Sequence, residues 1–240
     1  TNVAISPNGK YIAIATDNIK KNLNSYKIHV FDSETLNLVF LKTYQEDKDN
    51  YFEPNDLVVD DEANVFALGK LFISGKSKKK DGDANYDFVL NKISKDNNQS
   101  IKISLESDNF ISSLAINYYE NKLSLVGFYS NEREGNIKGG CNFIINAISL
   151  SISAKKNSEL PKDVYDDLYG DAKAERHDKK KKELNSFYVD YVVRDNMGNA
   201  SVLAEECYVT QTHVATGMNG SGYWTTTYHY DDILILKFDK

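Results

Sequence analysis

The sequence has little cysteine and little proline, and each shortage excludes a kind of architecture. With three prolines and thirteen glycines among 240 residues, no proline- or glycine-rich linker divides the chain, so we expect one or two hydrophobic cores. Two cysteines cannot form a disulfide framework. Cys141 and Cys207 could make one bridge between neighbouring units, but two separate buried thiols are the favoured interpretation.

Long apolar runs and an excess of basic residues are also missing. No apolar stretch approaches the roughly 20 residues that span a bilayer, so no transmembrane segment is predicted. The formal net charge of -6 gives no basic face from which DNA or RNA binding could start, so no nucleic-acid partner is predicted. The chain carries no signal-peptide pattern, and both of its ends fall in or directly after a strand-like pattern. We therefore expect a segment of a larger protein.

The residues that are present favour a globular β protein. The chain is 41% hydrophobic and 27% charged, which is an ordinary globular composition. Its aromatic residues are mostly tyrosine, with 16 Tyr and 11 Phe. Tyr, Ile and Val suit half-buried pleated surfaces, so the composition favours strands.

The clearest structural pattern is a repeated unit, best seen between residues 111 and 150. Stretches of apolar alternation at 111–117, 123–129 and 141–150 are joined by turn-forming residues, and 151–155 is the expected outer strand. Similar sets of strands flank this unit. They are expected at 3–5, 11–15, 26–31 and 36–41, at 55–60, 65–72, 87–93 and 101–105, and at 188–193, 200–204, 207–214, 224–230 and 233–238.

The spacing of these units indicates a period somewhat over 50 residues. Val3 and Leu57 are 57 − 3 = 54 residues apart, and Leu57 and Leu114 are 114 − 57 = 57 apart. The next equivalent, Val189, follows Leu114 by 75 residues, so an insertion of about 20 residues is expected. The predicted domain organisation is one propeller domain, or part of one. Its units are about 1–50, 51–108, 109–160 and 187–240, with a helical insertion at 161–186.

The insertion carries a helical pattern. Val164, Leu168 and Ala172 recur at helical spacing after Pro161. The lysine run at 179–182 is interpreted as a solvated face.

A family resemblance supports the repeat. The segment Ser6-Pro-Asn-Gly-Lys-Tyr-Ile-Ala13, followed by a strand at 28–32, resembles the strand-turn-strand signature of bacterial β-propeller repeats of the WD40-like, TolB type. The resemblance implies a propeller fold and a bacterial periplasmic or cell-surface setting. The predicted fold class is all-β. We expect a β-propeller of repeated four-stranded antiparallel blades with one helical insertion, as a segment of a larger propeller. A closed four-bladed propeller and a twisted β-sandwich are the alternatives.

Two patterns suggest metal binding, but neither supports a predicted metal site. The loop 81–87 places oxygen donors at alternate positions, yet Tyr86 and Lys92 stand where an EF-hand requires Gly and Glu, so a solvated hairpin tip is favoured. His213, His229 and Cys207 could bind zinc if they faced one another. A hairpin tip centred at 219–220 puts the two histidines on opposite faces, and a shift by one residue puts them on the same face.

The same predicted hairpin, formed by the two middle strands of the last unit, gathers aromatic residues. We predict a ligand or partner surface on it, made of Tyr208, His213, Tyr223, Trp224, Tyr228, His229 and Tyr230. Such a surface could stack sugar rings or contact a protein partner. The alternative is that aromatic and threonine pairs across the strands stabilise the ribbon itself.

No catalytic residue and no cofactor are predicted. The glycines form no nucleotide fingerprint, no Gly-x-Ser-x-Gly or paired-histidine zinc motif occurs, and no pair of carboxylates is singled out by spacing. The predicted function is a non-catalytic binding or scaffold module with a protein or glycan partner. The alternatives are a propeller-type enzyme acting on carbohydrate or peptide, with its catalytic residues elsewhere, and a structural spacer.

Overall fold

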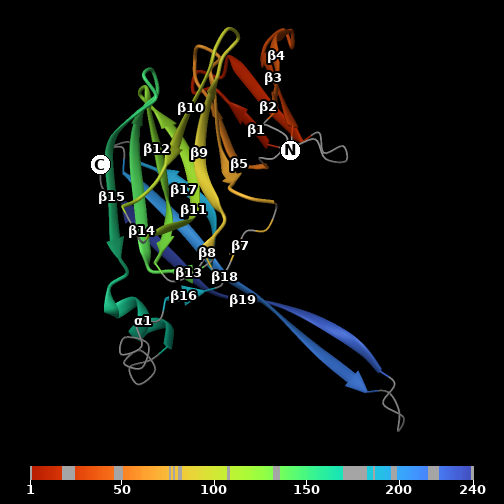
Figure 1. The fold of residues 1–240 in the computed structure, drawn as a ribbon, viewed down its shortest axis with the longest axis vertical. Coiled ribbons are helices and arrows are strands. Elements are labelled where there is room, and N and C mark those ends of the chain that lie inside the picture. The colour runs from red at the N-terminus through yellow and green to blue at the C-terminus, as the bar shows by residue number, and fades with distance from the viewer. Residues whose placement is uncertain are drawn as a thin grey trace.

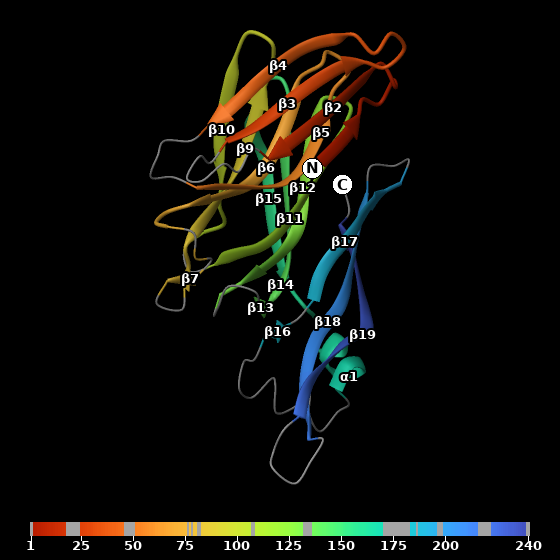
Figure 2. The ribbon, with the colours of Figure 1, turned by 90° about the vertical axis from the view of Figure 1, so that its right-hand side faces the viewer.

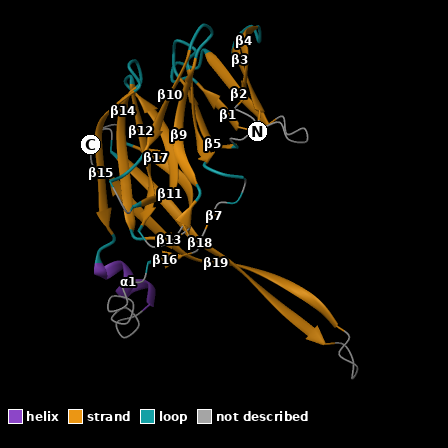
Figure 3. Ribbon diagram, viewed as in Figure 1, coloured by secondary structure: helices purple, strands orange, loops and turns teal. Residues whose placement is uncertain are grey.

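The protein is a stack of antiparallel β-sheets, as Figures 1 and 3 show. The computed structural model describes residues 2–17, 25–45, 51–75, 77, 79–80, 83–106, 109–131, 136–169, 183–185, 187–195, 199–215 and 222–238. The predicted Ala172, the lysine run 179–182 and most of the hairpin tip 217–222 lie outside these residues.

Four sheets follow one another along the chain, and neighbouring strands in each sheet are consecutive or nearly so. Sheet 1 contains β1 (Asn2–Ile5), β2 (Tyr11–Asp17), β3 (Ser25–Asp32) and β4 (Leu38–Gln45). Sheet 2 contains β5 (Phe52–Val59), β6 (Val65–Phe72), β9 (Tyr86–Ile93) and β10 (Asn98–Ile103). Sheet 3 contains β11 (Phe110–Tyr119), β12 (Lys122–Ser130), β14 (Gly139–Asn146) and β15 (Ser151–Glu159). Sheet 4 contains β17 (Phe187–Arg194), β18 (Ala200–Ala215) and β19 (Gly222–Phe238).

The smaller elements lie in connections between these strands. The pair β7 (Lys79–Lys80) and β8 (Asp83–Ala84) forms a short hairpin in the connection from β6 to β9, across the loop considered for a metal. β13 (Asn136–Ile137) pairs with β16 (Leu184–Asn185). The helix α1 (Lys162–Tyr169) begins directly after Pro161, as predicted, and Val164, Tyr165 and Leu168 pack on the core between sheets 3 and 4. In the described part of the chain, no helix is long and apolar enough to cross a membrane.

The first strands of successive sheets lie side by side. β1 contacts β5, β5 contacts β11, and β11 contacts β17. This order of antiparallel meanders around adjacent first strands is the arrangement of propeller blades. The all-β, propeller-like fold with repeated four-stranded sheets is therefore confirmed. Sheet 4 differs from the prediction in having three strands, because the segments predicted at 224–230 and 233–238 form the single strand β19.

Hydrophobic cores fill the spaces between consecutive sheets. Ala13, Ile28 and Val30 of sheet 1 meet Leu57 and Val65 of sheet 2. The other face of sheet 2, with Leu68 and Phe88, packs on Leu114 and Phe143 of sheet 3. Val126 and Phe128 of sheet 3 pack on Val202 and Ala204 of sheet 4. Sheets 2 and 3 are thus buried on both faces, so nearly every residue of β6 and β12 is buried, whereas in β2 the buried Ala13 and Ala15 alternate with half-buried residues.

A β-bulge at the same place in three first strands defines the repeat. Asn55 in β5, Ser112 in β11 and Asp190 in β17 are the residues that the pairing register skips. The repeat lengths are therefore 112 − 55 = 57 and 190 − 112 = 78 residues. The structural equivalent of Leu114 is Val192, three residues beyond the Val189 suggested by spacing, because 78 residues separate the bulges of β11 and β17.

The predicted turn between β1 and β2 is present. The Gly9 amide donates to the Ser6 carbonyl (2.8 Å), and Gly9 has a positive φ of 75°. The side chain of Asn8 accepts from the Lys10 amide (2.8 Å). A residue without Cβ is favoured at such a φ, which explains the Asn-Gly pair in this turn.

Candidate functional site: the aromatic arm

The two longest strands leave the body of the protein together. Up to Glu205, β18 pairs with both β17 and the end of β19 inside sheet 4. Beyond a bulge at Glu206, residues 207–215 and 222–230 continue as a two-stranded ribbon that points away from the sheets (Figures 1 and 2). We call this ribbon the arm. Nine residues per strand give it a length of about 30 Å.

The pairing register assigns every arm side chain to one of two faces. Tyr208 pairs with His229, and His213 pairs with Trp224. Because side chains alternate along a strand and paired residues share a face, two sets follow. The Trp face carries Cys207, Val209, Gln211, His213, Trp224, Thr226, Tyr228 and Tyr230. The opposite face, which we call the Thr face, carries Tyr208, Thr210, Thr212, Val214, Tyr223, Thr225, Thr227 and His229.

All seven residues of the predicted partner surface lie on the arm, but on both of its faces. His213, Trp224, Tyr228 and Tyr230 belong to the Trp face. The others, Tyr208, Tyr223 and His229, belong to the Thr face. A single flat partner could therefore contact only one of these groups.

The register excludes the zinc hypothesis. His213 and His229 lie on opposite faces of the ribbon, so their imidazoles cannot share a metal ion. Cys207 shares a face with His213 but is six residues away along the strand, roughly 20 Å. Within the described residues, no group of three or more His, Cys, Asp or Glu side chains is placed to hold a metal ion.

Side chains of the Thr face are engaged with one another. Tyr208 stacks on His229 with ring centroids 4.6 Å apart, and its hydroxyl donates to Asp231 Oδ2 (2.9 Å). That hydrogen bond raises the pKa of Tyr208. His229 Nε2 lies 2.8 Å from Thr210 Oγ1. These contacts are the cross-strand pairs that stabilise a ribbon, so the predicted structural role of the aromatic residues applies to this face.

The Trp face is open to solvent. Trp224 is 67% exposed, Tyr228 is 63% exposed and Tyr230 is 61% exposed. Val209 beside them is 49% exposed, and the ring of His213 lies 5.1 Å from that of Trp224 at a tilt of 60°. Three large aromatic rings thus stand in a row along one strand.

Charge is absent from the arm and concentrated at its base. Residues 207–215 and 222–230 include no Lys, Arg, Asp or Glu, although 27% of the whole chain is charged. Carboxylates begin at the base, with Glu205, Glu206, Asp231 and Asp232. Burial, followed by the nearby Asp232 and Asp231, raises the pKa of Glu206. The arm is therefore a neutral surface set apart from an acidic base.

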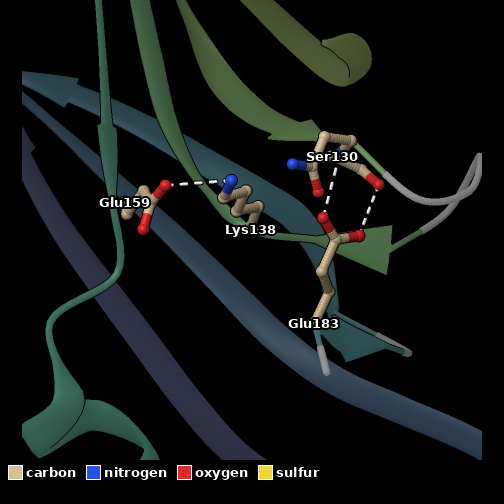
Figure 4. A network of polar contacts seen from close by, with 5 residues as sticks. Ser130, Lys138, Glu159 and Glu183 are labelled. Carbon is tan, nitrogen blue, oxygen red and sulfur yellow. Dashed lines mark hydrogen bonds and ion pairs between the residues drawn. The ribbon is translucent and has the colours of Figure 1, made fainter. Parts of the chain in front are cut away.

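A second polar constellation lies on sheet 3, where sequence reasoning had singled out no site (Figure 4). Ser130 Oγ donates to Glu183 Oε2 (2.5 Å), and the backbone N–H of Asn131 donates to Glu183 Oε1 (2.9 Å). Nearby, Lys138 Nζ lies 2.9 Å from Glu159 Oε1, and the hydrogen bond to Glu159 raises the pKa of Lys138. Ser130 and Glu183 are 53 residues apart in the chain, so no motif links them.

This second constellation is suited to anchoring. Ser130 is 0% exposed, so a substrate cannot reach its hydroxyl. Glu183 directly precedes β16, which pairs with β13. The buried carboxylate thus fastens the segment that leads into sheet 4 onto the end of β12.

A cleft of about 230 Å³ lies between β14, β15 and the end of β19. Gly140, Asn142, Leu236 and Phe238 line it together with the charged Lys156, Glu159 and Lys237, and no histidine or cysteine is among its lining residues.

No protein-family model matches the sequence, and a search of curated proteins found no similar sequence.

Proposed function

We propose that this chain is a non-catalytic binding module whose contact surface for a protein partner is the Trp face of the arm. The observation that carries the proposal is the row of Trp224, Tyr228 and Tyr230, each more than 60% exposed on an uncharged ribbon.

The chemistry of this face matches that of the centre of a protein interface. Interface centres are enriched in Trp and Tyr and depleted in charged residues, and these aromatic residues often contribute most of the binding free energy. Solvated glycans also stack on aromatic rings, but the face offers few side chains for orienting sugar hydroxyls. It has no carboxylate and a single amide, Gln211, beside His213, Thr226 and the polar groups of its aromatic rings. A protein partner is therefore the favoured occupant.

The form of the arm supports the same proposal. A two-stranded ribbon is marginally stable in water, and charged residues usually protect an exposed strand edge from unwanted pairing. The arm has no such charges along its paired segments. A partner that covers the Trp face would remove its apolar surface from water and stabilise the ribbon.

The setting that we propose is the bacterial cell envelope, on the strength of the resemblance between residues 6–13 and TolB-type repeats. The alternative function, an enzyme acting on carbohydrate or peptide, gains little support from the described residues. The buried Ser130 faces a carboxylate out of reach of substrate, and Glu159, the one carboxylate that lines the cleft beside β19, is paired with Lys138.

The proposal is tested by two matched substitutions on opposite faces. Peptide ligands selected from a displayed library against the intact chain are measured with the wild type, Trp224→Ala and Tyr223→Ala. Tyr223 is 56% exposed on the Thr face and serves as the control. We expect Trp224→Ala to weaken binding by about 30-fold, since truncation of a central interface aromatic costs about 2 kcal/mol, and Tyr223→Ala to change it by less than about threefold.

The single tryptophan provides a second readout. Because Trp224 is the sole Trp of the sequence, its emission reports on the Trp face directly and should shift to shorter wavelength when a partner covers it. Equal losses in both variants, or binding with unchanged emission, would contradict the proposed surface. Ligands obtained from a glycan array but not from the peptide library would replace the protein partner by a carbohydrate.

A further inference from the structure

One edge of β18 loses its neighbouring strand where the arm begins. In the body, β17 pairs with β18 from Ala200 to Glu206, and this pairing ends where Phe187 meets Glu206. Residues 207–215 pair with β19 alone (Figure 2), and no other described strand lies on their β17 side. Within the described chain, a row of backbone N–H and C=O groups is thus left without a strand partner.

The segment that precedes β17 is held away from this edge. If β17 began earlier in the chain, its pairing would continue along residues 207–215 of β18. Instead β16 pairs with β13, and Leu184 in β16 is 0% exposed. The carboxylate of Glu183 is bound by Ser130 and by the backbone of Asn131. These contacts hold the chain on the connection between β12 and β14, so the edge of β18 is open next to the arm.

Alternate residues of β18 direct their backbone groups toward the open edge. Thr225 Oγ1 donates to the Thr212 carbonyl (3.0 Å), so this carbonyl points toward β19. The Val214 carbonyl also points toward β19, because a Cβ added to Gly222 would clash with its oxygen. Successive residues of an antiparallel strand alternate in the direction of their backbone groups. The residues whose N–H and C=O point away from β19 are therefore Val209, Gln211 and His213.

This edge has none of the features that protect exposed strands. Natural edge strands carry charged residues, prolines or bulges. Residues 207–215 include no charged residue and no proline, and their pairing with β19 is regular. The edge of β19 differs, because Asp231 and Asp232 lie on it beside the arm. On β18 the nearest carboxylates, Glu205 and Glu206, lie where β17 covers the edge, so the arm edge of β18 is suited to accept a strand.

We propose that the partner of the arm binds by strand addition, as an extended segment that pairs antiparallel with residues 207–215 of β18, in line with β17. The direction follows from β17, which already pairs antiparallel with β18 next to the arm. In this mode of recognition, main-chain hydrogen bonds supply affinity and alternate side chains supply specificity. The inference rests on the function proposed for the arm and specifies how the partner is held.

The side chains of β18 indicate the composition of the bound segment. Val209 and His213 lie on the Trp face, and Thr210 and Thr212 lie on the Thr face. Neighbouring strands are stabilised when β-branched or aromatic residues lie opposite one another, and a charged residue would find no opposite charge here. The bound segment is therefore uncharged and rich in Thr, Val and aromatic residues. Its side chains on the Trp face lie beside His213, one strand away from Trp224.

The experiment compares the wild type, Gln211→Pro and Gln211→Ala in binding the peptides selected against the intact chain. Proline removes an N–H that points to the open edge, where strands tolerate it, whereas alanine removes only the side chain. We expect Gln211→Pro to weaken binding about tenfold or more, because a backbone hydrogen bond is lost, and Gln211→Ala to change it by less than about threefold. Circular dichroism and Trp224 emission equal to those of the wild type show that the ribbon is intact.

N-methylation of a bound peptide, one residue at a time, tests the same hydrogen bonds with the chain unaltered. We expect losses of about tenfold at every second peptide residue and small effects between them. Losses without this period of two would overturn strand addition, as would equal binding by Gln211→Pro and Gln211→Ala.

Trp224→Ala separates the two proposals. If Trp224→Ala weakens binding while Gln211→Pro and N-methylation do not, the function proposed for the arm stands and strand addition is wrong. If no peptide binds the intact chain, both are wrong.

Discussion

Cys141 and Cys207 are two thiols in different surroundings. Cys141 lies wholly buried between sheets 2 and 3, and burial raises the pKa of its thiol far above the ordinary range. Cys207 is half-buried at the start of the arm, beside Tyr230. The two are not bonded to each other, which agrees with separate thiols and corrects the expectation that both are fully buried.

This difference predicts selective modification. An aromatic disulfide reagent should label one thiol per folded chain, at Cys207, and two per chain in denaturant, because only a deprotonated and accessible thiol reacts. The stoichiometry is read from the absorbance of the released thiolate. Cys207→Ser should abolish the reaction of the folded chain, and a folded chain in which both thiols react would contradict the buried position of Cys141.

At the scale of elements, polar groups join the first strands of successive sheets. Asn55 Nδ2 donates to the Leu114 carbonyl (2.7 Å), and the Ile116 amide donates to Asp56 Oδ2 (2.9 Å). Asn55 and Asp56 belong to β5, and the backbone groups that their side chains bind belong to β11. The contact replaces hydrogen bonds to water at a place where backbone groups of β11 would otherwise lie unpaired.

Asp56 makes this contact dependent on pH. Burial raises the pKa of its carboxyl, and hydrogen bonds from the Ile116 and Leu57 amides offset this only in part. The folded state therefore holds the proton to higher pH than the unfolded state, and the contribution of Asp56 to stability is lost as pH rises through the folded pKa. The difference in unfolding free energy between the wild type and Asp56→Asn should fall from pH 4 to pH 7 in urea titrations. A difference that stays constant with pH would contradict the raised pKa.

The arm shows how an element can extend far from a core. The bulge at Glu206 ends the three-stranded pairing, and the ribbon beyond it depends on cross-strand contacts such as Tyr208–His229 and Thr225 Oγ1 to the Thr212 carbonyl (3.0 Å). Its Thr face supplies these two contacts, and on the Trp face the ring of His213 lies 5.1 Å from that of Trp224. In the function that we propose, the Thr face stabilises the ribbon and the Trp face binds the partner.

At the scale of the molecule, the sheets form a stack in which each contacts mainly its neighbours. Sheets 2 and 3 are covered on both faces, and sheets 1 and 4 on one. In such an arrangement, stability is a sum of sheet and interface contributions, so the end sheets open most easily.

Amide hydrogen exchange should follow this order. We expect β6 and β12 to exchange most slowly and the amides of β2 and β17 about tenfold faster. Uniform protection across the four sheets at low concentration would contradict the stack as the unit of stability.

The sequence by itself determined the strands and the repeat. Apolar alternation and turn chemistry are local, so the strand at 65–72 and the hairpin around Gly9 were predicted where the structure has them. The sequence also contains a repeated turn motif that the spacing of apolar residues did not reveal. Asp60 and Asp195 each accept from an Asn four residues later, in the same turn of two different sheets. The repeated Asp-x-x-x-Asn spacing would have aligned the fourth unit correctly.

Tertiary structure decided which residues meet. In the arm, His213 pairs with Trp224, whereas a tip centred at 219–220 would pair it with Thr226. The bulge at Glu206 also shifts the pairing between β18 and β19 by one residue. A one-residue slip moves every side chain to the other face, so neither the zinc hypothesis nor the Trp face could be resolved from alternation. The contact between Ser130 and Glu183 joins residues that are 53 positions apart in the sequence, and no local pattern indicates it. The sequence carries the local pattern of each strand, and only the packed fold sets register and long-range partners.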